Sequence, residues 1–351
     1  MEKTRVLVID DSAYNRRALA EMLEKSSGIE VVGTAPDGEQ GLKKALMLKP
    51  DVITLDLEMP IMDGFTFLRL LMVKMPTPVI VISARDHDAN VFKALELGAV
   101  DFLSKPTARI SKELMNIENN LISKVEVLSN LSMDNVTKRM EGHVDTAPPQ
   151  TDIKGEKKRK EKFEVMAIGS STGGPPALQS LFTSLPPEFP LSIVVSQHMP
   201  PGFTGAFSNR LDRLLPFDVS EAKSGDKVVK GRILIAPGGH HMTFKKVKGG
   251  VEVEISERDG NDIYAPSVDK MFTSVAEIFE ERAIGVILTG MGNDGKNGVK
   301  KIKRSKGYII AESEETAIVY GMPREAVNAG AVDKILPLND IGSQVCKLSD
   351  N

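Results

Sequence analysis

The stretch RVLVIDDSAYNRRALAEMLEK, residues 5–25, contains one complete strand–turn–helix unit. Arg5–Ile9 is a short run rich in β-branched residues, which is typical of a buried strand. Ser12–Lys25 follows, with apolar residues spaced so that they lie on one face of a helix. A strand that leads into such a helix is the building unit of a doubly wound parallel sheet.

The same unit recurs along the first third of the chain. Further strands are predicted at Ile29–Ala35, Val52–Asp56, Val79–Ser83 and Asp101–Leu103, and a last helix from about Ser111 to Leu131. Five such units predict one five-stranded, flavodoxin-like α/β domain at 1–125. The ligand crevice of such a domain lies at the carboxyl ends of its strands.

A change of composition at 126–162 predicts a linker. This stretch carries Pro148-Pro149, many charges and almost no aromatic residues, so it cannot bury enough apolar surface to fold alone. Residues 157–160 are Lys-Lys-Arg-Lys, which would suit an output that binds nucleic acid. Acidic neighbours Glu156 and Glu161 and the near-neutral chain favour a solvated tether instead. We therefore expect no nucleic-acid partner.

A second and larger α/β domain is predicted at 163–351. Its strands are expected at Val165–Gly169, Ser192–Gln197, Arg232–Ala236, Ala283–Thr289 and Gly307–Ala311. Within it, Met242–Val247 and Val251–Ile255 flank Lys248-Gly249-Gly250, which is a strong signal for a β-hairpin. The fold class is thus α/β, with two doubly wound parallel sheets and one hairpin.

The composition is that of a globular protein. The chain has 351 residues, 41% of them hydrophobic, and a formal net charge of −3. A single cysteine, Cys346, excludes a disulfide framework and a zinc site built from cysteines. The first residues do not resemble a signal peptide, and no apolar segment approaches the ~20 residues that span a bilayer. We expect a soluble, cytoplasmic protein without direct membrane insertion.

Three acidic residues follow directly after strands of the first domain. Asp10 and Asp11 come after the first strand, and Asp56 ends the third. Because the carboxyl ends of adjacent parallel strands meet at one edge, the three carboxylates should converge there. Their mutual repulsion calls for a cation, and oxygen ligands suit Mg²⁺. We expect Asp56 to accept a phosphoryl group.

Two further residues complete this phosphoacceptor set. Lys105, after the fifth strand, can neutralise developing charge, and Ser83, at the end of the fourth, can donate to a phosphoryl oxygen. The latter contact exists only in the phosphorylated state, so it can drive a switch. A lone aspartate at such a turn would be interpreted as a helix cap. Three of them with Lys105-Pro106 favour the phosphoacceptor site.

The second domain carries a candidate serine nucleophile. Residues 169–173 fit the G-x-S-x-G pattern between a strand and a helix, which places Ser171 near backbone N–H groups that stabilise an oxyanion. His198 ends the next strand, and Asp294 follows the strand Ala283–Thr289. A serine, a base and a carboxylate at one sheet edge can activate a hydroxyl. Their chain order differs from that of α/β-hydrolases and disfavours that fold.

Alternatives remain open for two of these roles. Ser170 adjoins Ser171 and competes with it as the nucleophile. His240 and His241 compete with His198 as the base, although these two begin the predicted hairpin. Only His198 ends a predicted core strand, which favours it.

One stretch also fits an unrelated chemistry. Residues 290–295 match G-x-G-x-x-G after a strand, the dinucleotide fingerprint, with Glu312 at the spacing expected for a ribose contact. This pattern would indicate a nicotinamide-dependent oxidoreductase. However, it lies late in its domain, and it places Asp294 where a pyrophosphate would be repelled.

The first domain resembles the receiver domains of two-component response regulators. The matching residues are Asp10, Asp11, Asp56, Ser83 and Lys105, with Phe102 at the position of that family's switching aromatic residue. The resemblance implies direct Mg²⁺ ligation by Asp11, Asp56 and the backbone carbonyl of Glu58, with Asp10 acting largely through water. It also implies a cis Lys105–Pro106 bond and a histidine kinase as the phosphodonor.

The second domain is similar to the catalytic domain of the CheB family of chemotaxis protein-glutamate methylesterases. The matching stretches are Ser-Ser-Thr-Gly-Gly at 170–174, Gln-His-Met-Pro-Pro-Gly-Phe-Thr at 197–204, Leu-Thr-Gly-Met-Gly-Asn-Asp-Gly at 288–295 and Gly-Met-Pro-Arg-Glu-Ala at 321–326. The resemblance implies that Ser171 is the nucleophile, His198 the base and then acid, and Asp294 the residue that orients His198. Met291 and Thr172 would supply oxyanion contacts.

These resemblances imply a function and its control. The expected substrates are glutamate methyl esters, and also glutamines, on methyl-accepting chemotaxis receptors, with no cofactor for the ester chemistry. The unphosphorylated receiver is expected to cover Ser171, and phosphorylation of Asp56 to uncover it. An alternative is a related serine esterase that acts on a substrate outside chemotaxis.

Overall fold

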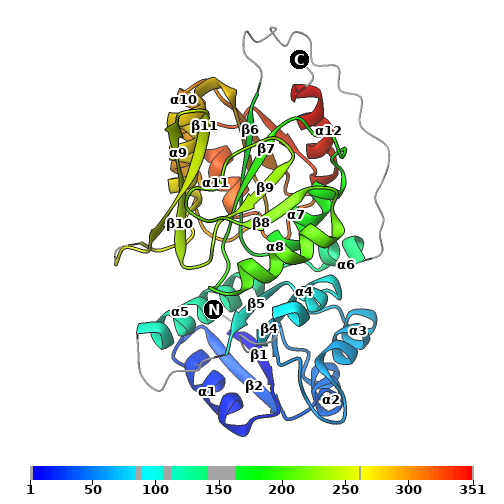
Figure 1. The fold of residues 1–351 in the computed structure, drawn as a ribbon. Coiled ribbons are helices and arrows are strands. Elements are labelled where there is room, and N and C mark those ends of the chain that lie inside the picture. Colours follow the sequence, from blue (N-terminus) through cyan, green and yellow to red (C-terminus); the bar gives the residue numbers. More distant parts are fainter. Residues whose placement is uncertain (1–2, 84–87, 106–111, 141–162, 261, 350–351) are drawn as a thin grey trace. The chain divides into compact units, whose positions relative to one another are not determined.

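The structure is a computed structural model that describes residues 3–83, 88–105, 112–140, 163–260 and 262–349. The chain divides into two compact units, Met1–His143 and Val144–Asn351 (Figure 1). Helix α5 (Lys112–Leu128) runs past residue 125, and helix α6 (Asp134–Met140) lies within the predicted linker. The boundaries at 125 and 162 stay predictions.

The first unit contains the predicted five-stranded parallel sheet. Its strands are β1 (Thr4–Ile9), β2 (Ile29–Ala35), β3 (Val52–Leu55), β4 (Val79–Ser83) and β5 (Asp101–Ser104). They are arranged in the order β2-β1-β3-β4-β5, and every neighbouring pair is parallel. The strand order reverses beside β1, which leaves a crevice at the carboxyl ends of β1 and β3.

Helices cover both faces of this sheet (Figure 1). They are α1 (Ala13–Leu23), α2 (Gly38–Leu48), α3 (Gly64–Lys74), α4 (Asp88–Glu96) and α5. Helices α1 and α5 pack against each other on one face, and α2 and α3 do so on the other. Ser12, Asp37 and Asp63 begin α1, α2 and α3, because each side chain accepts a backbone N–H of the first turn.

The second unit is built on a seven-stranded sheet whose paired strands are all parallel. Its strands are β6 (Val165–Ser170), β7 (Ser192–Gln197), β8 (Asp218–Glu221), β9 (Arg232–Ile235), β12 (Ala283–Ile287), β13 (Tyr308–Glu312) and β14 (Lys334–Leu336). The order is β14-β13-β12-β6-β7-β9-β8. The chain leaves β6 toward β7 and later returns on its other side as β12. The switch point of this sheet therefore lies beside β6.

The predicted hairpin is present as a separate two-stranded sheet. Strands β10 (His240–Val247) and β11 (Gly250–Glu257) pair antiparallel, with Val247 opposite Gly250. Gly249 has a φ of +100°, a conformation that a tight turn needs and that glycine adopts without strain. The strands begin earlier than predicted, so His240 and His241 lie within β10.

Helices of the second unit sandwich the sheet (Figure 1). They are α7 (Gly174–Thr183), α8 (Phe203–Leu214), α9 (Val268–Phe279), α10 (Lys296–Arg304), α11 (Met322–Asn328) and α12 (Leu338–Ser349), with a short 3₁₀ helix at Glu280–Arg282. Helix α9 packs on β6 and against both α10 and the hairpin, while α7 packs against α12.

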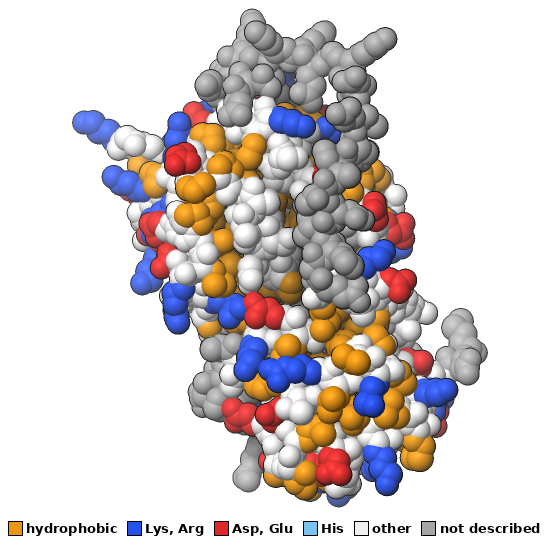
Figure 2. All heavy atoms as spheres, turned by 90° about the vertical axis from the view of Figure 1, so that its right-hand side faces the viewer, with side chains coloured by type: hydrophobic (Ala, Val, Ile, Leu, Met, Phe, Trp, Pro, Cys, Tyr) orange, Lys and Arg blue, Asp and Glu red, His pale blue; other side chains and the backbone are white. Residues whose placement is uncertain are grey.

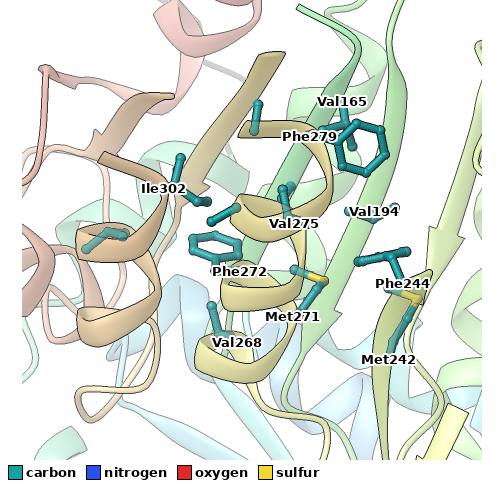
Figure 3. Close-up of a cluster of buried hydrophobic side chains, with 14 of the residues drawn as sticks. Val165, Val194, Met242, Phe244, Val268, Met271, Phe272, Val275, Phe279 and Ile302 are labelled. Carbon is teal, nitrogen blue, oxygen red and sulfur yellow. The ribbon is translucent and has the colours of Figure 1, made fainter. Parts of the chain in front are cut away.

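The main core of this unit lies under α9, as Figure 3 shows. Phe279 of α9 lies near Val165 of β6, and Phe272 lies on the side of α9 that faces α10. Phe244 of the hairpin closes the opposite side. Burying each large apolar side chain contributes about 1.5–3 kcal/mol relative to leaving it exposed. A hydrogen bond from the Phe244 N–H to the Ser274 hydroxyl ties the hairpin to α9. Helix α9 is therefore held against both the sheet and the hairpin.

The surface carries charges of both signs. On the face in Figure 2, lysine and arginine side chains are interspersed with acidic and hydrophobic ones, and the described residues form no continuous basic surface there. In the described part of the chain, no helix combines the length and the apolar composition needed to span a bilayer.

Candidate active site

Ser171 lies directly after β6, at the switch point of the larger sheet. Its N–H donates to the Thr289 carbonyl at 3.0 Å, and its own carbonyl accepts from the Gly174 N–H at 2.8 Å and from Gln197 Nε2 at 2.9 Å. The bonds with Thr289 and Gln197 tie the turn to the segment that follows β12 and to the last residue of β7. Gly173, with φ of +74°, makes the sharp entry into α7 possible.

The neighbouring serine has a different environment. Ser170 is fully buried, and its hydroxyl donates to Gln197 Oε1 at 2.6 Å. Successive residues of a strand point to opposite faces of a sheet, so the two serines cannot share one environment. The bond to Gln197 occupies the Ser170 hydroxyl, which favours Ser171 as the nucleophile.

His198 follows β7 and lies within hydrogen-bond distance of Asp294. His198 Nε2 lies 2.8 Å from Asp294 Oδ2. An ionised carboxylate can only accept, so Nε2 carries the proton and Nδ1 of the neutral ring is left as the basic nitrogen. The two residues lie 96 positions apart in sequence and meet because β7 and β12 flank β6.

Asp294 is held by the N-terminus of α9. Its carboxylate accepts from the N–H groups of Val268 at 2.7 Å and Asp269 at 2.9 Å, and from the Ser267 hydroxyl at 3.1 Å. Burial by itself would raise the pKa of Asp294. The hydrogen bonds from His198 and from the two backbone amides outweigh burial, so the pKa of Asp294 lies below its usual value. The carboxylate therefore stays charged beside His198.

The loop at 290–292 passes immediately beside Ser171. A Cβ on Gly290 would lie 2.9 Å from the Ser171 Cβ and 2.4 Å from Met322 Sδ, so only glycine fits. Backbone bonds from the Gly290 N–H to the Val319 carbonyl (3.0 Å) and from the Met322 N–H to the Gly290 carbonyl (2.8 Å) fix this position. Within the described residues, the N–H of Met291 donates no hydrogen bond. An N–H left over beside a nucleophile is the donor that an oxyanion hole requires.

The other predicted site residues are placed as follows. Thr172 is buried in the turn, and its carbonyl accepts from the Thr289 hydroxyl at 2.9 Å. His241 pairs with Asp262 at 2.7 Å, and His240 Nδ1 lies 3.2 Å from the Gly238 carbonyl. Neither histidine belongs to the cluster around Ser171. This favours His198 as the base.

Glu312 has a structural role in the same region. It is fully buried and accepts from the Thr289 N–H at 2.7 Å and from the Thr316 hydroxyl at 3.0 Å. Its carboxylate thus binds the backbone directly before Gly290. This arrangement disfavours a ribose contact, and with it the dinucleotide interpretation of 290–295.

Sequence patterns missed three residues of this site. Gln197 bridges both serines, Ser267 caps α9 and also donates to Asp294, and Tyr264 stacks on His198. Ser267 begins a Ser-Val-Asp start to an apolar helical pattern, which is a recognisable capping signal. Gln197 lies within the matching stretch 197–204, but nothing in the sequence signals its contacts with the two serines or the position of Tyr264, because both depend on tertiary contacts.

In the first unit, the three predicted carboxylates come together. Oxygen atoms of Asp10, Asp11 and Asp56 all lie within 4.8 Å of one another. Lys105 Nζ lies 2.5 Å from Asp56 Oδ2 and 3.5 Å from Asp10 Oδ2. The Glu58 N–H donates to Asp56 Oδ1 at 3.4 Å. The ligand role of the Glu58 carbonyl stays a prediction.

The electrostatics of this cluster fit a divalent cation. Burial raises the pKa of both Asp10 and Asp56, and Lys105 opposes that rise only in part. Three carboxylates face one ammonium group, which leaves an excess of negative charge on hard oxygen ligands. Asp10, Asp11 and Asp56 are therefore a donor set suited to Mg²⁺.

The predicted switch residues lie on the neighbouring strands. Ser83 ends β4 and is buried, opposite Ser104 in the register of β5. Phe102 is buried and makes an edge-to-face contact with Phe92, with 6.3 Å between ring centroids. Their switching roles stay predictions, and the Lys105–Pro106 bond lies outside the described residues.

Comparison with known proteins agrees with this organisation. Residues 6–116 match the response regulator receiver domain family, and residues 166–345 match the CheB methylesterase family. The chain is 49% identical to protein-glutamate methylesterase/protein-glutamine glutaminase 3 of Geobacter sulfurreducens, over 98% of this chain and 97% of that protein. Protein-glutamate methylesterase/protein-glutamine glutaminase 1 of Myxococcus xanthus is 46% identical, over 98% of this chain and 96% of that protein.

A solved structure supports the same assignment for the second unit. The crystal structure of the Thermotoga maritima CheB methylesterase catalytic domain is 41% identical and has a TM-score of 0.52, covering 54% of this chain and 100% of that one. Fold and site together define a response regulator with a receiver domain and an α/β catalytic domain. The chain belongs to the CheB methylesterase family.

The acidic cluster predicts a stabilising effect of Mg²⁺ on the full chain. At ten times its dissociation constant, Mg²⁺ should add about 1.4 kcal/mol to the unfolding free energy of the first unit. Folding raises the pKa of Asp10 and Asp56, so the metal-free unit loses stability as pH rises through their folded values. The Mg²⁺ effect should grow over that range. Thermal unfolding with and without Mg²⁺ measures it.

The matched variants are Asp11→Asn and Glu24→Gln, each of which removes one negative charge from the first unit. Asp11→Asn should abolish most of the Mg²⁺ effect, because Asp11 is in the cluster. Glu24→Gln, at the exposed end of α1, should leave the effect intact. A Mg²⁺ effect that survives in Asp11→Asn would contradict this assignment.

Proposed function

We propose that the chain is a phosphorylation-controlled methylesterase that hydrolyses glutamate methyl esters on chemoreceptors and releases methanol. The observation that carries the proposal is the contact between His198 and Asp294 at the sheet edge where Ser171 lies, with the His198 backbone N–H donating to the carbonyl of the neighbouring Ser170. Ser171, His198 and Asp294 follow the three adjacent strands β6, β7 and β12, at the switch point of the sheet. The names of relatives 46–49% identical to this chain agree with this chemistry.

Acylation begins with attack of the Ser171 hydroxyl oxygen on the ester carbonyl. His198 takes the serine proton at Nδ1, because Nε2 is committed to Asp294. The charged Asp294 stabilises the imidazolium that forms. When the tetrahedral intermediate collapses, the bond to the methoxy oxygen breaks, and His198 returns the proton so that methanol leaves.

Deacylation repeats these steps with water as the nucleophile. His198 removes a proton from water, the resulting hydroxide attacks the acyl carbonyl, and Ser171 is released with its proton restored. The product is a glutamate side chain. In both halves we expect the Met291 N–H to donate to the oxyanion, because an oriented donor lowers the barrier most where charge develops.

The same acyl-enzyme would form from a carboxamide. Attack of Ser171 on a receptor glutamine expels ammonia in place of methanol and leaves the same glutamyl ester of the enzyme. Glutaminase activity therefore requires no additional residue. Both reactions would take place in the cytoplasm, on the cytoplasmic helices of the receptors.

The first unit supplies the control. Asp56 is the proposed acceptor of a phosphoryl group from a histidine kinase, and Lys105 lies next to it. Mg²⁺, when bound by the acidic cluster, would neutralise charge on the phosphoryl group. Ser83 and Phe102 then respond to the phosphorylated state. We propose that the unphosphorylated receiver restricts access to Ser171 and that phosphorylation removes this restriction.

The nucleophile is tested by methanol release from methylated receptor membranes. Ser171→Ala should lower release by at least about a thousandfold, because the covalent step is lost. Ser170→Ala is the matched control, since it removes an adjacent hydroxyl that is bonded to Gln197. It should retain activity within about tenfold. Equal release by the wild type and Ser171→Ala would contradict the proposed nucleophile, and no release by any form would contradict the proposed substrate.

Control by phosphorylation is tested on the same membranes. A histidine kinase as phosphodonor, added with Mg²⁺, should raise methanol release by the wild type but not by Asp56→Asn. A chain shortened to 163–351 should release methanol faster than the unphosphorylated full chain and should not respond to the kinase. A shortened chain with the same low basal rate would contradict the restriction of access.

A further inference from the structure

His198 is stacked on an aromatic ring from a loop outside the matching motifs. The ring centroids of His198 and Tyr264 lie 4.5 Å apart, and the ring planes differ by 7°. Asp294 binds one edge of the imidazole, and Tyr264 covers one of its faces. Two independent contacts therefore fix both the position and the plane of the His198 ring.

The hydroxyl of the same tyrosine meets the loop that carries Met291. A Cβ on Gly292 would lie 2.5 Å from the Tyr264 hydroxyl oxygen, and Gly292 has a φ of +90°. The tip of Tyr264 thus packs against the backbone one residue after the proposed oxyanion donor. A single side chain contacts the candidate base through its ring face and the oxyanion loop through its tip.

Tyr264 is held from both sides along the chain. Two residues earlier, Asp262 accepts from His241 Nε2 at 2.7 Å, from the Asp259 N–H at 2.8 Å and from Lys270 Nζ at 2.7 Å. One residue later, the Ala265 carbonyl accepts from the Gly239 N–H, directly before the start of β10, at 3.1 Å. These bonds attach the loop to the hairpin and to α9, the same helix that holds Asp294.

The charge of Asp262 and the protonation of the Tyr264 hydroxyl do not change near neutral pH. Lys270, followed by the Asp259 amide and His241, holds the pKa of Asp262 well below its usual range, so this carboxylate stays ionised. Burial and the nearby charge of Asp294 raise the pKa of Tyr264, so its hydroxyl stays protonated. The stack therefore presents an uncharged tyrosine ring to His198 near neutral pH.

We propose that Tyr264 is a positioning residue for ester hydrolysis. Its ring face orients His198 and stabilises the imidazolium that forms when Ser171 loses its proton, because the face of an aromatic ring attracts a cation. Its hydroxyl keeps the loop at Gly292 beside Ser171. The proposal rests on the proposed function for the roles of Ser171 and His198.

The first test needs no substrate. The chain has five histidines, so NMR of the full chain with labelled histidine can follow each imidazole, with His198→Gln used to assign the His198 signal. Replacing the ring in Tyr264→Leu should lower the pKa of His198 by about half a unit, since the imidazolium loses its aromatic partner. Tyr264→Phe keeps the ring and should leave the pKa of His198 unchanged.

The second test measures turnover on methylated receptor membranes. Tyr264→Leu should lower kcat for methanol release about tenfold with little change in KM, and should move the acidic limb of the pH profile downward with the pKa of His198. Tyr264→Phe should lower kcat less, since only the contact of the hydroxyl with Gly292 is lost. Tyr308→Leu, which removes a tyrosine at the start of β13 that packs on Phe163, is the control and should change neither quantity.

The outcomes separate this proposal from the proposed function. An unshifted pKa of His198 in Tyr264→Leu would overturn the role of Tyr264, whatever the substrate is. A shifted pKa in an enzyme that releases no methanol would support the role of Tyr264 and contradict the proposed substrate. If thermal unfolding shows that Tyr264→Leu does not fold, Tyr264→Met carries the same expectations with an unbranched side chain.

Discussion

The carboxylate of Asp294 is the point on which the catalytic unit depends. It accepts two backbone amides at the N-terminus of α9 and the hydroxyl of Ser267, and it contacts Nε2 of His198. The amides and the helix dipole favour the negative charge, and the charge in turn fixes which nitrogen of His198 remains basic. Helix α9 is buried along one face in the main core, so the helix that binds Asp294 also contributes to the packing of this unit.

The same topological feature, a reversal of strand order, determines where the acidic cluster and the candidate active site lie. In each sheet the strand order reverses once, beside β1 in the first unit and beside β6 in the second. Loops that leave adjacent strands in opposite directions cannot fill the crevice between them, so side chains from both can enter it. The cluster of Asp10, Asp11 and Asp56 and the group around Ser171 occupy equivalent places. The acidic cluster and the candidate hydrolase site thus lie at the same kind of position, the switch point of a parallel sheet.

Sequence patterns predicted the parts of this fold that local physics controls. Buried parallel strands have continuous apolar runs, and nearly all of them were located, whereas the edge strands β8 and β14 were missed because they are short and partly exposed. Residues at strand ends were also predicted as a group. Sequence patterns did not predict the roles of residues that come together only in the tertiary fold. Examples are Gln197, which contacts both serines, and Tyr264, which stacks on His198. The contact of Gln197 with Ser170 distinguishes two serines that the motif could not.

The most direct test of this account is the rate of methanol release by Asp294→Asn in the full chain. Asparagine keeps the shape and can still cap α9, but it lacks the charge and can present an N–H to His198, which disturbs the ring tautomer. We expect kcat to fall by about 10³- to 10⁴-fold, while thermal stability changes modestly. A variant that folds and keeps more than about a tenth of the wild-type kcat would contradict the claim that the charge of Asp294 organises the site.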